Sequence, residues 1–281
     1  MHFSLTRATF MLLQICNLEC DVSVKAPIPM LFLGHGSPMN ALELNRWTQH
    51  WRQAAANLKP KAILLISAHW DKPGLRVLTD PHPRTIHDFG GFAPALYQQQ
   101  YPAPGSAALA GLVLELLADL DTQPDSDWGF DHGAWSVLGH AFPAADVPVV
   151  QLSIDSRHDA AWHLQVGALL TSLREEGVLI IGSGNIVHNL RLLDWQDGPA
   201  PEWAQQFMHK VEDAIARRDW QALCDYQRWG QVATLAVPHP DHLLPLFYLL
   251  GASDKNEPFH WFNQDFTLGN LAMHSLRIGE A

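Results

Sequence analysis

The chain has 281 residues, of which 47% are hydrophobic and only 17% are charged. This composition suits a large domain with a full core, although the length alone also allows two small domains. The formal net charge is −11 with histidine neutral, and lysine and arginine form no cluster longer than Arg217–Arg218. Because nucleic-acid binding needs clustered basic side chains, the sequence argues against a nucleic-acid partner.

The cysteines indicate the compartment. Cys16, Cys20 and Cys224 are sparse and odd in number, which does not suit a disulfide framework. Unpaired thiols are typical of a reducing cytosol, so we expect a cytoplasmic protein.

The first residues are expected to stand apart from the fold. Residues 1–29 contain a short apolar run after Arg7, but this run lacks a small-residue cleavage site and is too short to cross a bilayer. We interpret residues 1–29 as an N-terminal extension, poorly packed or preceding a true start at Met30, with export as the alternative. Residues 30–281 are expected to form one domain, with no membrane association.

Strand and helix patterns alternate along the chain. Short continuous apolar runs predict buried strands, and amphipathic periodicity between them predicts helices. In chain order we expect a strand at Met30–Leu33, a helix at Leu42–Leu58, a strand at Ala62–Ser67, a helix at Ser106–Leu120, a strand at Val147–Leu152, a helix at Asp159–Arg174, a strand at Val178–Ile181 and helices at Pro201–Arg217 and Leu243–Leu250. This order predicts a single-domain α/β fold with a mostly parallel sheet covered by helices.

Several of the predicted strands are followed by a histidine. His35, His69 and His188 each come after a different strand, in turns rich in small residues that leave room for a ligand. Because ligands of open α/β sheets bind outside the carboxyl ends of the strands, we expect these side chains to converge. A single histidine after a strand is more often hydrogen-bonded or solvated than a ligand, but the joint placement favours a metal site.

Two further motifs could add to this cluster. In Pro238–His242, Asp241 is expected to cap the following helix, which would place His242 in its first turn. His132 follows Asp131 in what we interpret as a glycine-containing loop. His82 and His87 flank Arg84 in a loop and could face the substrate or be solvated, with solvation favoured for His82. His239 is expected to be a loop residue. The following histidines are expected to be surface or structural residues: His50, His158, His163, His209, His260 and His274.

Clustered imidazoles suit a divalent metal. Imidazole is the commonest protein ligand for metals, and three neutral rings keep the full positive charge of the ion while leaving positions open for a substrate. A further histidine nearby can move protons. Trp70, Trp128 and Trp135 border the histidine motifs and could line an aromatic pocket, whereas Ser37 and Ser183 are interpreted as turn residues.

The ordered motifs resemble those of the 4,5-DOPA extradiol dioxygenase-like family, which belongs to the class III, LigB-type extradiol dioxygenases. The resemblance covers about Met30 to the C-terminus, so residues 30–281 would form the catalytic domain. The motifs are Gly34-His35-Gly36-Ser37-Pro38-Met39, Ser67-Ala68-His69-Trp70, Thr85-Ile86-His87-Asp88-Phe89-Gly90-Gly91-Phe92, Tyr101-Pro102-Ala103-Pro104-Gly105, Trp128-Gly129-Phe130-Asp131-His132-Gly133, Gln151-Leu152-Ser153-Ile154-Asp155, Gly182-Ser183-Gly184-Asn185 and His188-Asn189-Leu190.

The resemblance implies roles for these residues. His35, His69 and His242 would bind one divalent metal ion, and His188 would be a fourth ligand or the acid–base residue. His132 would be a second acid–base or substrate-orienting histidine. The family fold would be a mixed or parallel sheet with helices on both faces.

The implied activity is 4,5-cleavage of a catechol such as L-DOPA with O₂. Iron enzymes of the wider superfamily use two histidines and one glutamate, whereas here the third position is His242, so the site suits Zn²⁺ as well as Fe²⁺. Because Zn²⁺ has no redox chemistry, two alternatives stay open, a zinc-dependent hydrolase with His188 as base and a catalytically inactive, metal-binding relative. The oligomeric state stays open.

Overall fold

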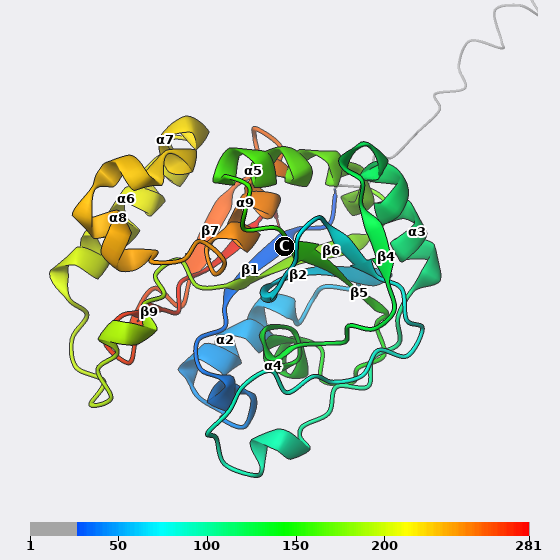
Figure 1. The fold of residues 1–281 in the computed structure, drawn as a ribbon, viewed down its shortest axis with the longest axis horizontal. Coiled ribbons are helices and arrows are strands. Elements are labelled where there is room, and N and C mark those ends of the chain that lie inside the picture. Colours follow the sequence, from blue (N-terminus) through cyan, green and yellow to red (C-terminus); the bar gives the residue numbers. More distant parts are fainter. Residues whose placement is uncertain (1–26, 281) are drawn as a thin grey trace, which may run out of the picture.

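An eight-stranded sheet forms the centre of the computed structural model, which describes residues 27–280 (Figure 1). The strand order is β4-β3-β5-β2-β6-β1-β10-β7. The strands are β1 (Met30–Gly34), β2 (Ala62–Asp71), β3 (Arg76–Leu78), β4 (Gln123–Asp125), β5 (Val149–Ile154), β6 (Val178–Gly184), β7 (Phe259–Phe262) and β10 (Ser275–Ile278); β8 (Phe266–Thr267) and β9 (Leu271–Ala272) form a separate pair. The predicted extension at residues 1–29 lies almost wholly outside the described residues.

The central strands are parallel and buried, as the apolar runs predict. β6 lies between β1 and β2, and Ser183 of β6 is in register with Leu33 of β1 and with Ser67 of β2. Parallel strands in this register end at the same edge of the sheet, so the residues after β1, β2 and β6 are delivered to one place.

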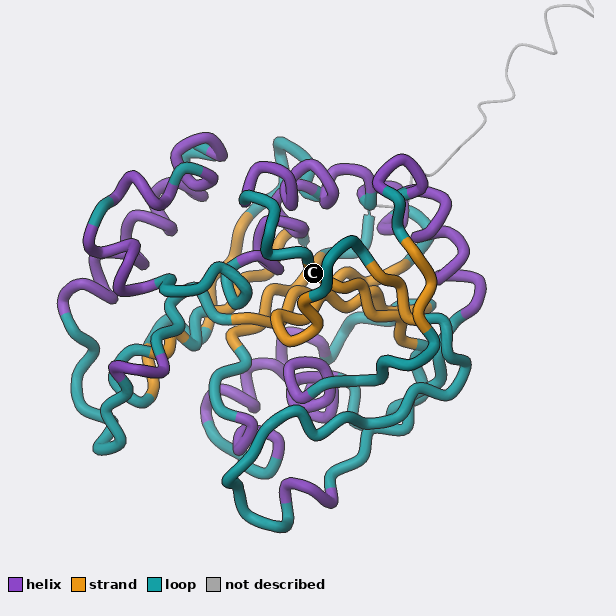
Figure 2. Tube along the Cα trace, in the orientation of Figure 1, coloured by secondary structure: helices purple, strands orange, loops and turns teal. Residues whose placement is uncertain are grey.

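Helices cover both faces of the sheet (Figure 2), which confirms the predicted fold class. Alternate residues of each strand enter two separate cores, because successive side chains point to opposite faces. One core contains α2 (Arg46–Ala55) and α4 (His132–Ala141); the other contains α3 (Ala107–Leu116), α5 (Ala160–Leu169), α6 (Glu202–Ala216), α7 (Trp220–Cys224), α8 (Gln231–Ala236) and α9 (Leu244–Gly251). Within residues 27–280, none of these helices has the length and apolar character needed to cross a bilayer.

Polar N-caps fix where several helices begin. The helix expected from Leu42 begins at Arg46, because the side chain of Asn45 accepts hydrogen bonds from the backbone N–H groups of Trp47 and Thr48. Ser106, the first residue of the helix expected at Ser106–Leu120, is the N-cap of α3. These side chains accept hydrogen bonds from backbone N–H groups in the first turn, which have no acceptor within the helix.

The glycine-containing loop predicted at His132 is wrong. Asp131 is the N-cap of α4, and its side chain accepts a hydrogen bond from Ala134 N at 3.1 Å. Gly133 and Gly139 lower the helix propensity of this segment, which hides it from a pattern-based prediction. His132 is therefore held rigidly in the first turn of a buried helix.

The sheet is mixed because strands near both of its edges pair antiparallel with their neighbours. The sequence analysis did not predict β3, β7 or β10. β10 pairs antiparallel with β1 and β7, and β3 pairs antiparallel with β5 at Val77 and Leu152. β3 is only three residues long, and β7 is only partly buried, so neither forms the long apolar run by which a buried strand is recognised.

A buried ion pair joins segments far apart in the chain. The Arg174 guanidinium pairs with the Glu257 carboxylate, and it also donates hydrogen bonds to the carbonyl oxygens of Ile28 at 3.0 Å and Ala252 at 3.1 Å. Arg174 is only 1% exposed. Because an unpaired buried charge is costly, these contacts fix the chain before β1 against the segment that leads into β7.

His163 is a structural histidine, as expected. It lies on α5 without solvent exposure, with Nε2 3.1 Å from the Asp155 carbonyl oxygen and Nδ1 3.1 Å from the Tyr248 hydroxyl. The carbonyl can only accept, so Nε2 carries the proton and Nδ1 accepts from Tyr248. Burial lowers the pKa of His163 to about 4.

We expect His163 to make the protein less stable in acid. Its folded pKa lies below the unfolded value of about 6.5, so the unfolded chain binds more protons and stability falls as the pH drops from about 6.5 to about 4. At pH 4.5 this loss is on the order of 2.5 kcal/mol. In His163→Gln that share of the pH dependence should be absent.

The measurement is urea unfolding of chelator-treated protein at pH 7 and pH 4.5. His82→Gln, in an exposed loop, is the matched control and should keep the wild-type dependence. Equal pH dependence in wild type and His163→Gln would contradict the prediction.

Candidate active site

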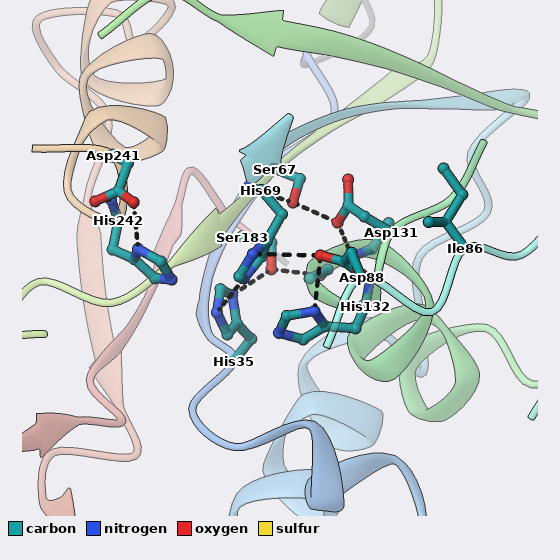
Figure 3. Close-up of polar contacts among 12 residues, drawn as sticks. His35, Ser67, His69, Ile86, Asp88, Asp131, His132, Ser183, Asp241 and His242 are labelled. Atoms are coloured by element: carbon teal, nitrogen blue, oxygen red, sulfur yellow. Dashed lines mark hydrogen bonds and ion pairs between the residues drawn. The ribbon is translucent and has the colours of Figure 1, made fainter. Parts of the chain in front are cut away.

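Histidines from separate parts of the chain meet at the carboxyl edge of the sheet (Figure 3). His35 directly follows β1, and His69 lies near the end of β2. His242 lies in the turn before α9, and His132 is the first residue of α4. His188 lies in the loop after β6. The structure thus brings together the histidines that the sequence singles out.

Three of these rings can offer ligand atoms to one ion. One ring nitrogen each from His35, His69 and His242 lies within 4.8 Å of the others. Nε2 of His35 is 3.2 Å from Nε2 of His69. Nε2 of the buried His242 has no polar partner among the described residues, whereas its Nδ1 faces the Asp241 carboxylate. A buried nitrogen without a partner, together with two imidazole nitrogens that face each other, fits a shared cation.

The turn that carries His242 packs closely on β6. Asn185 N donates a hydrogen bond to the His242 carbonyl oxygen at 2.9 Å, and a Cβ at Gly184 would lie 2.1 Å from the same oxygen. Only glycine permits this approach. The expected capping of α9 by Asp241 is wrong, since the N-cap is Leu243 without a side-chain hydrogen bond. Asp241 instead places Oδ2 3.2 Å from His242 Nδ1.

The hydroxyl of Ser183 sets the tautomer of His35. Ser183 lies within β6 and is fully buried, so its interpretation as a turn residue is wrong. Its Oγ donates to the Gly133 carbonyl oxygen at 2.5 Å and lies 3.0 Å from His35 Nδ1. A hydroxyl has a single proton to donate, so Nδ1 of His35 donates to Ser183. This leaves Nε2 of His35 with a free lone pair that faces His69.

A glycine also allows α4 to approach β2. A Cβ at Gly133 would lie 2.6 Å from Ser67 Oγ and 2.8 Å from Cδ2 of His69. A side chain at this position would therefore displace His69 or the helix. The glycine that hides α4 in the sequence is needed for the geometry of the site.

The buried rings are neutral at physiological pH. Burial is the larger cause, and the charges of the neighbouring histidines the smaller one, that lower the pKa values of His35 and His69 well below the usual value for histidine. A neutral imidazole is the form that binds metal ions. The crowding that prevents protonation thus prepares these rings as ligands.

His188 lies beside this trio rather than within it. Its ring stacks on that of His242, with ring centroids 3.5 Å apart and an angle of 6° between the planes. Burial, and then the neighbouring His242, lowers the pKa of His188 to about 2. His188 is therefore a neutral base on one side of the trio.

His132 lies on the other side, and Asp88 holds it. The ring centroids of His132 and His69 are 3.8 Å apart. Asp88 accepts hydrogen bonds from His132 N at 2.8 Å and from His132 Nδ1 at 2.9 Å, and its Oδ2 also lies 3.4 Å from His69 Nδ1. Burial raises the pKa of Asp88, but hydrogen bonds from His132 outweigh this and lower it overall. Asp88 belongs to a motif noted in the sequence, although no spacing rule connects it with His132.

The start of α4 is anchored by a second carboxylate. Asp131 is fully buried and accepts hydrogen bonds from Ser67 Oγ at 2.6 Å and Gln151 Nε2 at 2.6 Å. Because Ser67 and Gln151 lie on β2 and β5, this network fixes the helix start to the sheet. His132 is positioned as a consequence.

An aromatic ring from a loop, that of Phe89, packs against His132. Phe89 packs edge-on against His132, with ring centroids 5.6 Å apart, and also contacts Trp135. Of the tryptophans expected to line a pocket, Trp70 is buried and stacks on Trp128. Phe89 thus contacts a site histidine, although the sequence analysis assigned it no role beyond its place in a family motif.

The remaining histidines of residues 27–280 lie outside the cluster. His274 is buried, His87 Nε2 lies 3.1 Å from the Gln99 carbonyl oxygen, and the exposed ones include His50, His82, His239 and His260. These positions agree with the structural, loop and surface roles expected for them.

Comparisons with known proteins identify the family of this chain. Residues 29–270 match the family LigB, described as the catalytic LigB subunit of aromatic ring-opening dioxygenase. A protein of Escherichia coli (strain K12) named 4,5-DOPA dioxygenase extradiol is 47% identical over 90% of this chain and 95% of its own length. A protein of the same name from Beta vulgaris is 40% identical over 88% of this chain and 95% of its own length.

A solved structure shares the fold. The crystal structure of an uncharacterized protein from Escherichia coli K12 is 42% identical in sequence, with a TM-score of 0.79, and the match covers 90% of this chain and 100% of that one. The family match, the relatives and the fold agree, and the chain belongs to the LigB family of aromatic ring-opening dioxygenases.

Proposed function

We propose that the protein is a metal-dependent extradiol dioxygenase that cleaves a catechol with O₂, with L-DOPA as the candidate substrate for 4,5-cleavage. Family membership and the names of the relatives indicate an oxidoreductase of the extradiol dioxygenase type. The observation that carries the proposal of metal dependence is the trio of imidazole nitrogens within 4.8 Å of one another. The reducing cytoplasm is the proposed location.

His35, His69 and His242 are the proposed ligands. Their Nδ1 atoms each face an oxygen atom, from Ser183, Asp88 and Asp241 respectively, which leaves the Nε2 lone pairs for the ion. Fe²⁺ at this position would supply the redox chemistry that O₂ requires, whereas Zn²⁺ would supply only a Lewis acid.

His132 and His188 are the proposed acid–base residues. His132 lies beside His69, and His188 lies beside His242, so a catechol bound at the trio would have an imidazole ring on either side. Each ring could accept a proton from a phenolic oxygen. For His188, service as a fourth ligand is the alternative, and the experiment with His188→Ala separates the two roles.

The proposed activity predicts oxygen uptake that depends on the metal. Apo-protein reloaded with Fe²⁺ should consume O₂ with L-DOPA or simple catechols and form a yellow product, whereas protein reloaded with Zn²⁺ should not, because Zn²⁺ is not redox-active. An oxygen electrode and an absorbance trace give the measurement. No uptake in either form would overturn the proposal and favour a zinc-dependent hydrolase or an inactive metal-binding relative.

Replacing His188 should separate metal binding from turnover. In His188→Ala we expect iron to stay bound and kcat to fall by about 10²- to 10⁴-fold, the usual contribution of an acid–base residue. Metal content and oxygen uptake are the two measurements. His239→Ala, at an exposed position in the segment before His242, is the control. Loss of iron would instead assign His188 as a ligand, and full activity would remove it from the mechanism.

The Ser183 hydroxyl should contribute to metal affinity. In Ser183→Ala, His35 loses the acceptor that fixes its tautomer, so we expect metal affinity to fall by about tenfold or more. Competition with a chelator of known affinity measures the change. Ser136→Ala is the matched control, because the Ser136 hydroxyl is buried without a hydrogen-bond partner among the described residues. Equal affinities in the two variants would contradict the prediction.

A further inference from the structure

We propose that Asp88 is a positioning residue that holds His132 in the tautomer with a free Nε2 and thereby makes it a base. This inference rests on the proposed function, because it concerns the proton that the substrate gives up. Asp88 is not among the residues for which the sequence or the family resemblance implies a role.

The contacts of Asp88 bind it to His132 at two points. Oδ1 accepts a hydrogen bond from the backbone N of His132, and Oδ2 accepts one from Nδ1 of the same residue. This two-point contact fixes the carboxylate against both the backbone and the ring. The backbone N–H belongs to the first turn of α4, where helical N–H groups lack partners and the helix dipole favours an anion.

The direction of the ring contact determines the tautomer. A carboxylate in this arrangement can only accept, so Nδ1 of His132 carries a proton, and in the neutral ring Nε2 is then the unprotonated nitrogen. Nothing else among the described residues makes a hydrogen bond to the ring of His132. Without Asp88 the tautomer and the rotation of the ring would no longer be fixed.

The same oxygen lies near the metal trio. Oδ2 of Asp88 is 3.4 Å from Nδ1 of His69 and 2.9 Å from Nδ1 of His132 (Figure 3). One carboxylate oxygen thus lies between a proposed ligand and a proposed base, and it orients both rings with Nδ1 towards Asp88. Their relative placement then depends on a single side chain.

Asp88 also lies at the point where its loop leaves the rest of the fold. Two residues before Asp88, Ile86 N donates a hydrogen bond to the Phe130 carbonyl oxygen at 2.7 Å. From Phe89 to Phe92 no backbone N–H group forms a hydrogen bond with the described chain. The Asp88 carboxylate and the Phe89 ring, which packs on His132, therefore hold this segment beside the site.

The isosteric variant Asp88→Asn provides a direct test. The asparagine amide can accept from His132 N with its oxygen, and its NH₂ group then faces Nδ1 of the ring as a donor. His132 is forced into the opposite tautomer, with the proton on Nε2, while the shape of the site is retained. Asp80→Asn, in the preceding loop and away from the cluster, is the matched control.

The first measurement is the tautomer itself. Nitrogen-15 NMR of histidine-labelled, Zn²⁺-loaded protein reports which ring nitrogen of His132 is protonated, with the signal assigned by comparison with His132→Gln. We expect an unprotonated Nε2 in wild type and in Asp80→Asn, and a protonated Nε2 in Asp88→Asn. A protonated Nε2 in wild type, or an unchanged tautomer in Asp88→Asn, would overturn the proposal without reference to activity.

The second measurement is turnover of the Fe²⁺-loaded protein at saturating metal. We expect kcat of Asp88→Asn to fall by about 10²- to 10⁴-fold with iron content unchanged, as for loss of a general base. A changed tautomer with wild-type kcat would overturn the role in positioning a base. If wild type does not turn over any catechol, the dioxygenase proposal fails and the NMR result alone decides the role of Asp88.

Discussion

The site depends on the crowding of imidazole rings that cannot all carry charge. His35 and His69 approach within 3.2 Å at Nε2, and the rings of His188 and His242 stack at 3.5 Å. Protonated rings at these distances would repel one another in a buried environment where charge is poorly screened. The rings of His35, His69 and His188 are therefore neutral. A neutral ring has one nitrogen that needs a proton acceptor and another that needs a donor or a cation.

Oxygen atoms around the cluster meet the first of these needs. Ser183, Asp88 and Asp241 face the Nδ1 atoms of the three proposed ligands, and each reaches its position from a different element of the fold. Ser183 depends on the register of β6 between β1 and β2, whereas Asp241 depends on the close approach that Gly184 permits. The sheet thus sets the proton positions of the site as well as its shape.

The sequence predicts the central strands and most of the site histidines, because buried parallel strands are continuous apolar runs and their ends share one edge. It does not predict α4, since Gly133 and Gly139 resemble loop residues until the contact of Gly133 with His69 is known. It also leaves Asp88 and Ser183 without a role. Their partners lie 44 and 148 residues away, and no local pattern carries such a pairing.

Carboxylates lie next to the proposed ligands rather than among them. In a facial triad of two histidines and one carboxylate, the carboxylate neutralises part of the charge of the ion directly. Here the trio is all imidazole, and the Asp88 and Asp241 carboxylates face the far side of two of its rings. With the proposed ion bound, they would orient those rings without occupying a coordination position. Under the proposed function, the site would keep the charge of a divalent ion for an anionic ligand, which is the form that a catechol would reach after giving its protons to neighbouring histidines.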